Sequence, residues 1–129
     1  MLRLIKILNS NNQFETVRLE YNYGANLGPG SALSCTIDGF NSAANTSMPE
    51  YVALSVSDIH SSKMDAILVT EDMVFKVEYL GSETPYIGMS VGLATHKYKM
   101  DAVTYNSSGK GTIIGVDDSK KLVYVRFHR

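Results

Sequence analysis

Three histidines are the residues with the most immediate chemical potential, because imidazole can bind a metal ion or transfer a proton near neutral pH. His60, His96 and His128 fall in three different predicted loops or ends. None has a second ligand two to four residues away with the character of a metal site. His60 follows Asp58 by two residues, which is a weak pair. The histidines therefore predict neither a metal site nor a catalytic centre.

Two acidic pairs, Glu71-Asp72 and Asp117-Asp118, have the residue type that binds divalent ions. Neither begins a calcium-binding loop, because no series of ligands at alternate positions follows. Aspartate also favours turns, where its side chain bonds to nearby backbone. We therefore interpret Asp117-Asp118 as part of a turn between two strands, and neither pair as an ion site.

No other motif in the chain indicates catalysis. The serines include no Gly-x-Ser-x-Gly elbow, and the glycine-rich stretches 28–30 and 109–111 do not lie between a strand and a helix, as a phosphate cradle requires. We find no catalytic constellation and predict a protein that is not an enzyme, with no cofactor and no bound metal.

The single cysteine, Cys35, excludes an intrachain disulfide and any site built from several cysteines. It lies between Leu33 and Ile37 in an alternating run. This position predicts a small buried hydrophobic residue rather than a reactive thiol.

Charge argues against two classes of partner. The 129-residue chain has 12 basic and 13 acidic residues and a net charge of −1. Nucleic-acid binders gain affinity largely by neutralising phosphates, and anionic membranes likewise attract basic segments. The sequence therefore predicts neither nucleic acid nor membrane as partner. The opening apolar segment is short and contains charges, so we expect no signal peptide and no secretion.

One short basic and aromatic cluster leaves an alternative open. His96-Lys97-Tyr98-Lys99 resembles the edge of a ligand or nucleic-acid groove, in which cations alternate with stacking rings. On this second hypothesis the chain is a small OB-like or SH3-like binding barrel.

The positioning elements are predicted to be β-strands throughout. Met73, Phe75, Val77 and Tyr79 alternate with polar or smaller residues, which is the period of a half-buried strand. Similar alternation recurs in 17–23, 33–37, 52–56, 89–93, 101–104, 113–116 and 122–127, whereas 24–31, 41–49 and 58–65 read as loops. We predict about eight or nine short strands and an all-β fold, as a small barrel or sandwich.

The opening segment departs from clean alternation. Between Met1 and Leu8 the apolar residues occupy both faces, which is typical of a central strand or of one pressed against another chain. With the strand ending at Tyr23 it predicts an N-terminal hairpin or extended arm over residues 1–29, followed by the barrel domain over 30–129. The predicted contacts with another chain are the apolar residues of these two strands: Leu2, Leu4, Ile5, Ile7, Val17, Leu19, Tyr21 and Tyr23.

Several stretches together resemble one known family. These are 30–33 with 38–40, then 49–53, 66–77 and 87–93, followed by the closing strands 101–103, 111–116 and 123–127. They are similar to the capsid decoration (cement) proteins of tailed bacteriophages. Lys76 stands where that family usually has an acidic residue, and residues 1–23 match only loosely.

The resemblance implies a β-tulip-like head-stabilising protein that binds the outer surface of the expanded capsid and bridges major capsid protein subunits. It also implies a homo-oligomer, with a trimer favoured, made in the host bacterial cytoplasm and located on the virion exterior. A tail or baseplate β-domain is the alternative among virion parts, since it would obey the same barrel physics.

Overall fold

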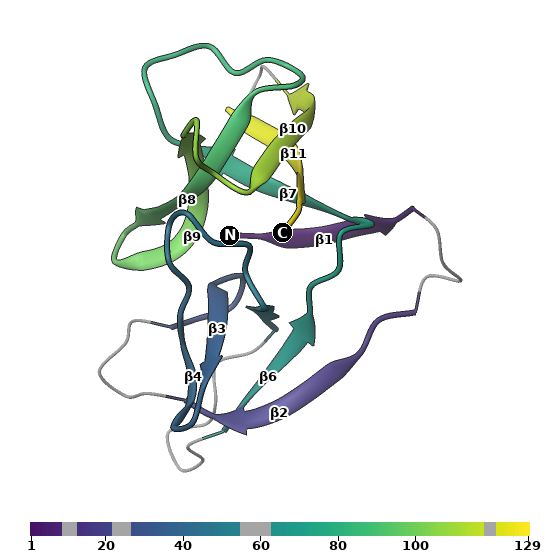
Figure 1. Ribbon diagram of the computed structural model, residues 1–129, viewed down its shortest axis with the longest axis vertical. Coiled ribbons are helices and arrows are strands. Elements are labelled where there is room, and N and C mark those ends of the chain that lie inside the picture. Colours follow the sequence, from purple (N-terminus) through teal and green to yellow (C-terminus); the bar gives the residue numbers. More distant parts are fainter. Residues whose placement is uncertain (9–12, 22–26, 55–62, 118–120) are drawn as a thin grey trace.

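The computed structural model describes residues 1–8, 13–21, 27–54, 63–117 and 121–129. Within these ranges the secondary structure consists of eleven β-strands and no helix. The predicted all-β class is confirmed, and it includes a closed barrel. Figure 1 shows the barrel at one end of the molecule, a second sheet at the other end, and β1 crossing between them.

The barrel is formed by five strands of the C-terminal half. These are β7 (Met73–Tyr79), β8 (Ser90–His96), β9 (Lys99–Tyr105), β10 (Gly111–Asp117) and β11 (Leu122–Phe127). Their order is β7-β11-β10-β8-β9, and a short parallel pairing returns β9 to β7. Leu80 continues this closure, because its backbone N–H donates to the Val103 carbonyl at 2.8 Å.

β1 (Arg3–Ile7) extends the same sheet by pairing with the first half of β7. The register shifts between Leu4 and Lys6, which marks a β-bulge at Ile5. An extra residue reverses the alternation of faces, so Leu2 and Ile7 both reach the core. The bulge explains why the opening segment is apolar on both faces.

The second sheet has the order β2-β6-β5-β3-β4. Its strands are β2 (Thr16–Glu20), β3 (Ala32–Thr36), β4 (Gly39–Ser42), β5 (Tyr51–Ala53) and β6 (Lys63–Leu68). A parallel bridge between Tyr21 and Phe40 brings its two outer strands together. Across β2 and β6, Arg18 donates two hydrogen bonds to the Asp65 carboxylate, which lowers the pKa of that carboxyl group.

Two apolar clusters fill the protein. The larger cluster lines the barrel and includes Phe75 and Phe127, whose ring centroids lie 6.0 Å apart. The smaller cluster lies within the second sheet, around Leu33, Phe40 and Met64. Ala32, Val52 and Ile67 come from the second sheet but belong to the larger cluster. The two sheets therefore share a core.

Three details differ from the sequence-based expectations. β1 and β2 do not form a hairpin, because β1 pairs with β7 and β2 with β6. The division between the two sheets does not coincide with the expected boundary at residues 29 and 30, since strands β2 to β6 share one sheet. The expected loop over 58–65 gives way to a strand from Lys63 onward.

Cys35 is exposed, so the expectation of a buried cysteine was wrong. β5 is only three residues long and pairs with β3 at Ala32 and Leu33. The second half of β3, which contains Cys35, therefore does not pair with β5, and its side chains stay exposed although the sequence alternates there.

Candidate functional site

The eight predicted contact residues do not form one surface. Leu2 and Ile7 are buried in the larger cluster, and Leu4 packs against it. Val17, Leu19 and Tyr21 pack half-buried against the smaller cluster, and Tyr23 lies outside the described residues. Ile5 is exposed, since the bulge turns it outward. Most of these side chains therefore hold the protein's own sheets together.

An apolar groove lies where β1 approaches β5. Its volume is about 260 Å³, and its lining includes Met1, Leu4, Phe14 and Leu54. Met1, Phe14 and Leu54 are each between 46% and 49% exposed. The hydrogen bond from the Leu2 N–H to the Gly30 carbonyl, 3.0 Å long, holds β1 against the second sheet at this point.

Sequence reasoning missed Phe14 and Leu54 as surface residues of one site. Phe14 follows a polar stretch without a pattern of its own, and Leu54 belongs to the alternating run 52–56, which predicts a strand but not a surface site. They meet because the Leu68 N–H donates to the Glu15 carbonyl, and the Leu54 N–H to the Asp65 carbonyl, which ties both segments to β6. Only strand pairing brings them together.

A second candidate site is a polar cluster where the barrel closes. His96 Nε2 lies 3.6 Å from Glu78 Oε2, and His96 Nδ1 lies 3.9 Å from Asp101 Oδ1. Asp101 is only 8% exposed, and its Oδ1 has no hydrogen-bond partner. The Met1 ammonium group lies 3.7 Å from Asp101 Oδ2 and donates to the Asp101 carbonyl oxygen. We call Glu78, His96 and Asp101 the closure cluster.

The closure cluster links three barrel strands, because its members come from β7, β8 and β9. Within the described residues, no group of three histidine, cysteine or carboxylate side chains is placed to hold a metal ion. What the arrangement can do is electrostatic: an imidazolium between two carboxylates would strengthen the contact between these strands.

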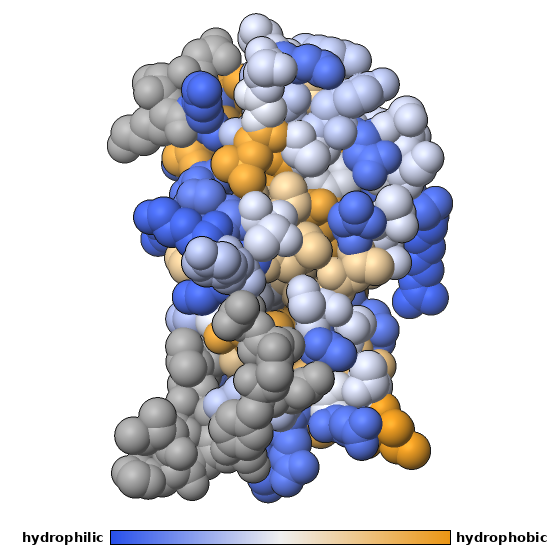
Figure 2. All heavy atoms as spheres, turned by 90° about the vertical axis from the view of Figure 1, so that its left-hand side faces the viewer, coloured by the Kyte–Doolittle hydropathy of each residue, from blue (hydrophilic) through white to orange (hydrophobic). Residues whose placement is uncertain are grey.

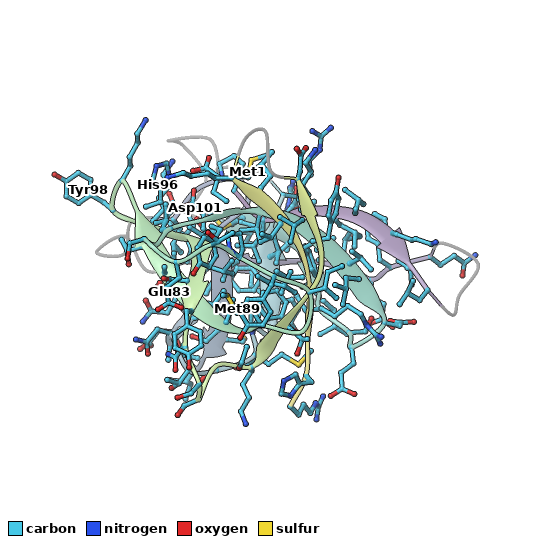
Figure 3. The ribbon with its side chains drawn as sticks, turned by 90° about the horizontal axis from the view of Figure 1, so that it is seen from above. Met1, Glu83, Met89, His96, Tyr98 and Asp101 are labelled. Carbon is cyan, nitrogen blue, oxygen red and sulfur yellow. The ribbon has the colours of Figure 1, made fainter. Side chains whose placement is uncertain are left out.

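The turn that follows His96 presents an exposed tyrosine. His96 pairs with Lys99 across the β8–β9 hairpin, so Lys97 and Tyr98 form its two-residue turn. Tyr98 is 83% exposed. Figure 3 shows it projecting away from the body of the protein, with His96 and Asp101 between it and Met1.

The third candidate site is a hollow at one end of the barrel, beside Tyr79. Its volume is about 350 Å³, and the loop over residues 81–85 lines it together with Val116 and Lys121. Burial raises the pKa of the Tyr79 phenol, and the Glu83 carboxylate adds to the effect.

The remaining chemical candidates have structural partners or lie outside the described residues. Thr70 donates to the Asp72 carboxylate within a turn. The Glu71 carbonyl accepts two hydrogen bonds from Arg126. Asp117 was expected in a turn but is the last residue of β10, paired with Leu122, and its carboxylate lies 4.0 Å from the Lys76 amine. His60 and Asp118 fall outside the described residues.

No match to this chain is found among known protein families, curated proteins or solved structures. A search of the described residues also finds no helix of the length and hydrophobicity needed to cross a bilayer.

Proposed function

We propose that this chain is a structural protein of a tailed-phage virion, which binds the outer surface of the capsid and bridges major capsid protein subunits. The observation that carries the proposal furthest is the apolar groove beside β1, with its partly exposed rim. Apolar side chains grouped in a concave surface are typical of protein-binding sites. The family resemblance supplies the identity of the partner.

In this role the protein stabilises the shell by burying apolar side chains against it and catalyses no reaction. Met1, Phe14 and Leu54 would lose their remaining exposure against the shell, and each large apolar side chain removed from water contributes about 1–2 kcal/mol. The groove is held between two paired sheets, so little ordering is needed on binding. Self-association, with a trimer favoured, would multiply the contacts with the shell.

Co-sedimentation with expanded capsid shells that lack the protein tests the proposal. The wild-type chain should bind saturably at a fixed ratio to the major capsid protein. The double variant Phe14→Ser, Leu54→Ser should bind at least about tenfold more weakly, because it removes apolar area from the rim of the groove.

Ile37→Ser is the matched control, because Ile37 is fully exposed on the distant β3–β4 hairpin. It should bind like the wild type. A folded wild-type protein that does not bind expanded shells would contradict the capsid role. Binding to purified tails or baseplates instead would support the alternative virion part.

A different class of function has its own supporting observation. The hollow beside Tyr79 lies at a barrel end, where small β-barrels often bind ligands, and it combines the buried phenol with Glu83 and Lys121. A small ligand-binding barrel is therefore the second candidate. Soaking with a library of small polar molecules, followed by NMR of residues 79–85, would detect such a ligand.

A further inference from the structure

The β8–β9 hairpin turn is built from residues that its backbone disfavours. Lys97 has φ of 49° and Tyr98 has φ of 73°, both in the left-handed region. A two-residue turn with two positive φ values usually contains Asn-Gly, because Cβ crowds the following carbonyl oxygen there, which glycine avoids and asparagine offsets by local hydrogen bonding. The sequence therefore keeps a lysine and a tyrosine at some cost to stability.

Contacts with the described residues do not offset that cost. Tyr98 is 83% exposed and Lys97 is also exposed. In the part of the chain that the structure describes, neither side chain forms a hydrogen bond, ion pair or ring contact. Residues held in a disfavoured backbone conformation cluster at sites that contact another molecule, where that contact offsets the strain.

The base of the hairpin is held in place. His96 lies between Glu78 and Asp101, and the Thr95 hydroxyl contacts Met100 Sδ at 3.9 Å. The part of the hairpin beyond the His96–Lys99 pair is the turn of Lys97 and Tyr98. An anchored base and an exposed aromatic tip make a preorganised contact, which binds without a large loss of conformational entropy.

The structure divides the basic cluster around this turn. The Lys99 amine points back toward Gly28, since a Cβ built on that glycine would lie 2.7 Å from Lys99 Nζ. His96 faces the two carboxylates of the closure cluster. Among the described residues, the tip therefore presents the Lys97 cation and the Tyr98 ring without a partner. A nucleic-acid backbone is bound by several cations at once, so this tip fits it poorly.

Figure 2 shows hydrophobic residues in separate groups among hydrophilic ones on one face of the molecule, rather than in one continuous patch.

We propose that Lys97 and Tyr98 form a contact site for a partner protein that offers a carboxylate next to an aromatic or apolar slot. Tyrosine supplies a large ring with little entropy to lose, and lysine supplies the charge that orients it. This site is distinct from the apolar groove beside β1.

The test is an NMR titration of the ¹⁵N-labelled chain with a random copolymer of glutamate and tyrosine, which carries both features. The backbone signals of residues 96–99 should shift saturably, and the shifts should diminish with added salt. Poly-L-glutamate and duplex DNA of equal charge should bind at least about tenfold more weakly.

Two variants separate binding from folding. Lys97→Asn with Tyr98→Gly should raise the Tm, because the turn no longer contains disfavoured residues, and should weaken copolymer binding at least about tenfold. Lys97→Glu should weaken binding without raising the Tm. Ile37→Ser, on the β3–β4 hairpin, should change neither measurement.

Unshifted tip signals with the copolymer would overturn the proposal, as would equal binding by the Asn-Gly variant. Stronger shifts with DNA than with the copolymer would indicate a nucleic-acid contact and would also overturn it. No capsid shell is used, so the result is independent of the virion role.

Discussion

Tyr79 illustrates how burial alters a single side chain in this protein. It ends β7 with only 3% of its surface exposed, beside a loop that carries Glu83. An ionised phenol loses hydration in such a site, so desolvation raises its pKa above the ordinary value of 10.0, and the nearby carboxylate raises it further. The shift links this residue to the pH dependence of folding.

We predict that stability falls as the pH rises above about 10. The unfolded chain loses the Tyr79 proton near its ordinary pKa, whereas the folded chain holds it to higher pH. The free energy of unfolding is therefore unaffected by the ionisation of Tyr79 below about pH 10, and it falls as the pH rises through the folded-state pKa of Tyr79. Urea unfolding between pH 9 and 11 measures the effect. Tyr79→Phe should lose stability less steeply over this range, and an unchanged slope would contradict the prediction.

At the scale of the elements, one glycine allows the second sheet to close. Gly39 has φ of 104°, and a Cβ at this position would lie 2.1 Å from the Glu20 carbonyl oxygen. The residue thus permits β4 to approach the end of β2, next to the Tyr21–Phe40 bridge. The Asp38-Gly39 turn signal is visible in the sequence, but the close approach to β2 is not.

A pair of alanine substitutions separates backbone strain from steric contact. Gly88 also has positive φ, at 95°, but its Cβ would meet open space. Gly88→Ala should therefore lower the free energy of unfolding by about 1–2 kcal/mol through strain alone. Gly39→Ala should cost a further 1–3 kcal/mol, approximately, because the added methyl group also displaces the backbone of β2. Chemical denaturation measures both variants, and equal losses would show that the close contact has no energetic effect.

At the scale of the whole molecule, β6 connects the two apolar clusters. Met64 and Ala66 face the smaller cluster, whereas Ile67, on the opposite face, packs into the larger one. The second sheet buries its smaller cluster by itself, but it buries Ala32, Val52 and Ile67 together with the barrel. The protein should therefore unfold as one cooperative unit.

We predict that Ile67→Ala destabilises both sheets together, by about 2–5 kcal/mol, because it opens a cavity in the shared core. Native-state hydrogen exchange checks this prediction. Amides of β3 and β5 should lose protection in step with amides of β10 and β11. Selective loss of protection in the second sheet would show instead that the sheets unfold separately.

The candidate sites were only partly predictable. Of the predicted contact residues, Leu4 lines the groove and Ile5 is exposed, whereas Leu2 and Ile7 are core residues because a bulge changes which face they occupy. Phe14 lies outside any regular pattern, and the alternation around Leu54 predicts a strand but no surface site. The motif over residues 96–99 was visible in the sequence. That Lys99 points toward Gly28 and that His96 lies beside Glu78, while Lys97 and Tyr98 stay exposed, depends on segments far away in the chain.

What the sequence by itself determined is the presence of the strands and hence the all-β class. Alternation is local, so the pattern from Met73 to Tyr79 predicts β7 with its observed ends. The tertiary structure alone decided that β1 joins the barrel sheet, that β2 joins the other sheet, and that β9 returns to β7. Pairing joins residues far apart in the chain and depends on which apolar faces can be buried together, a property that no short stretch of sequence contains.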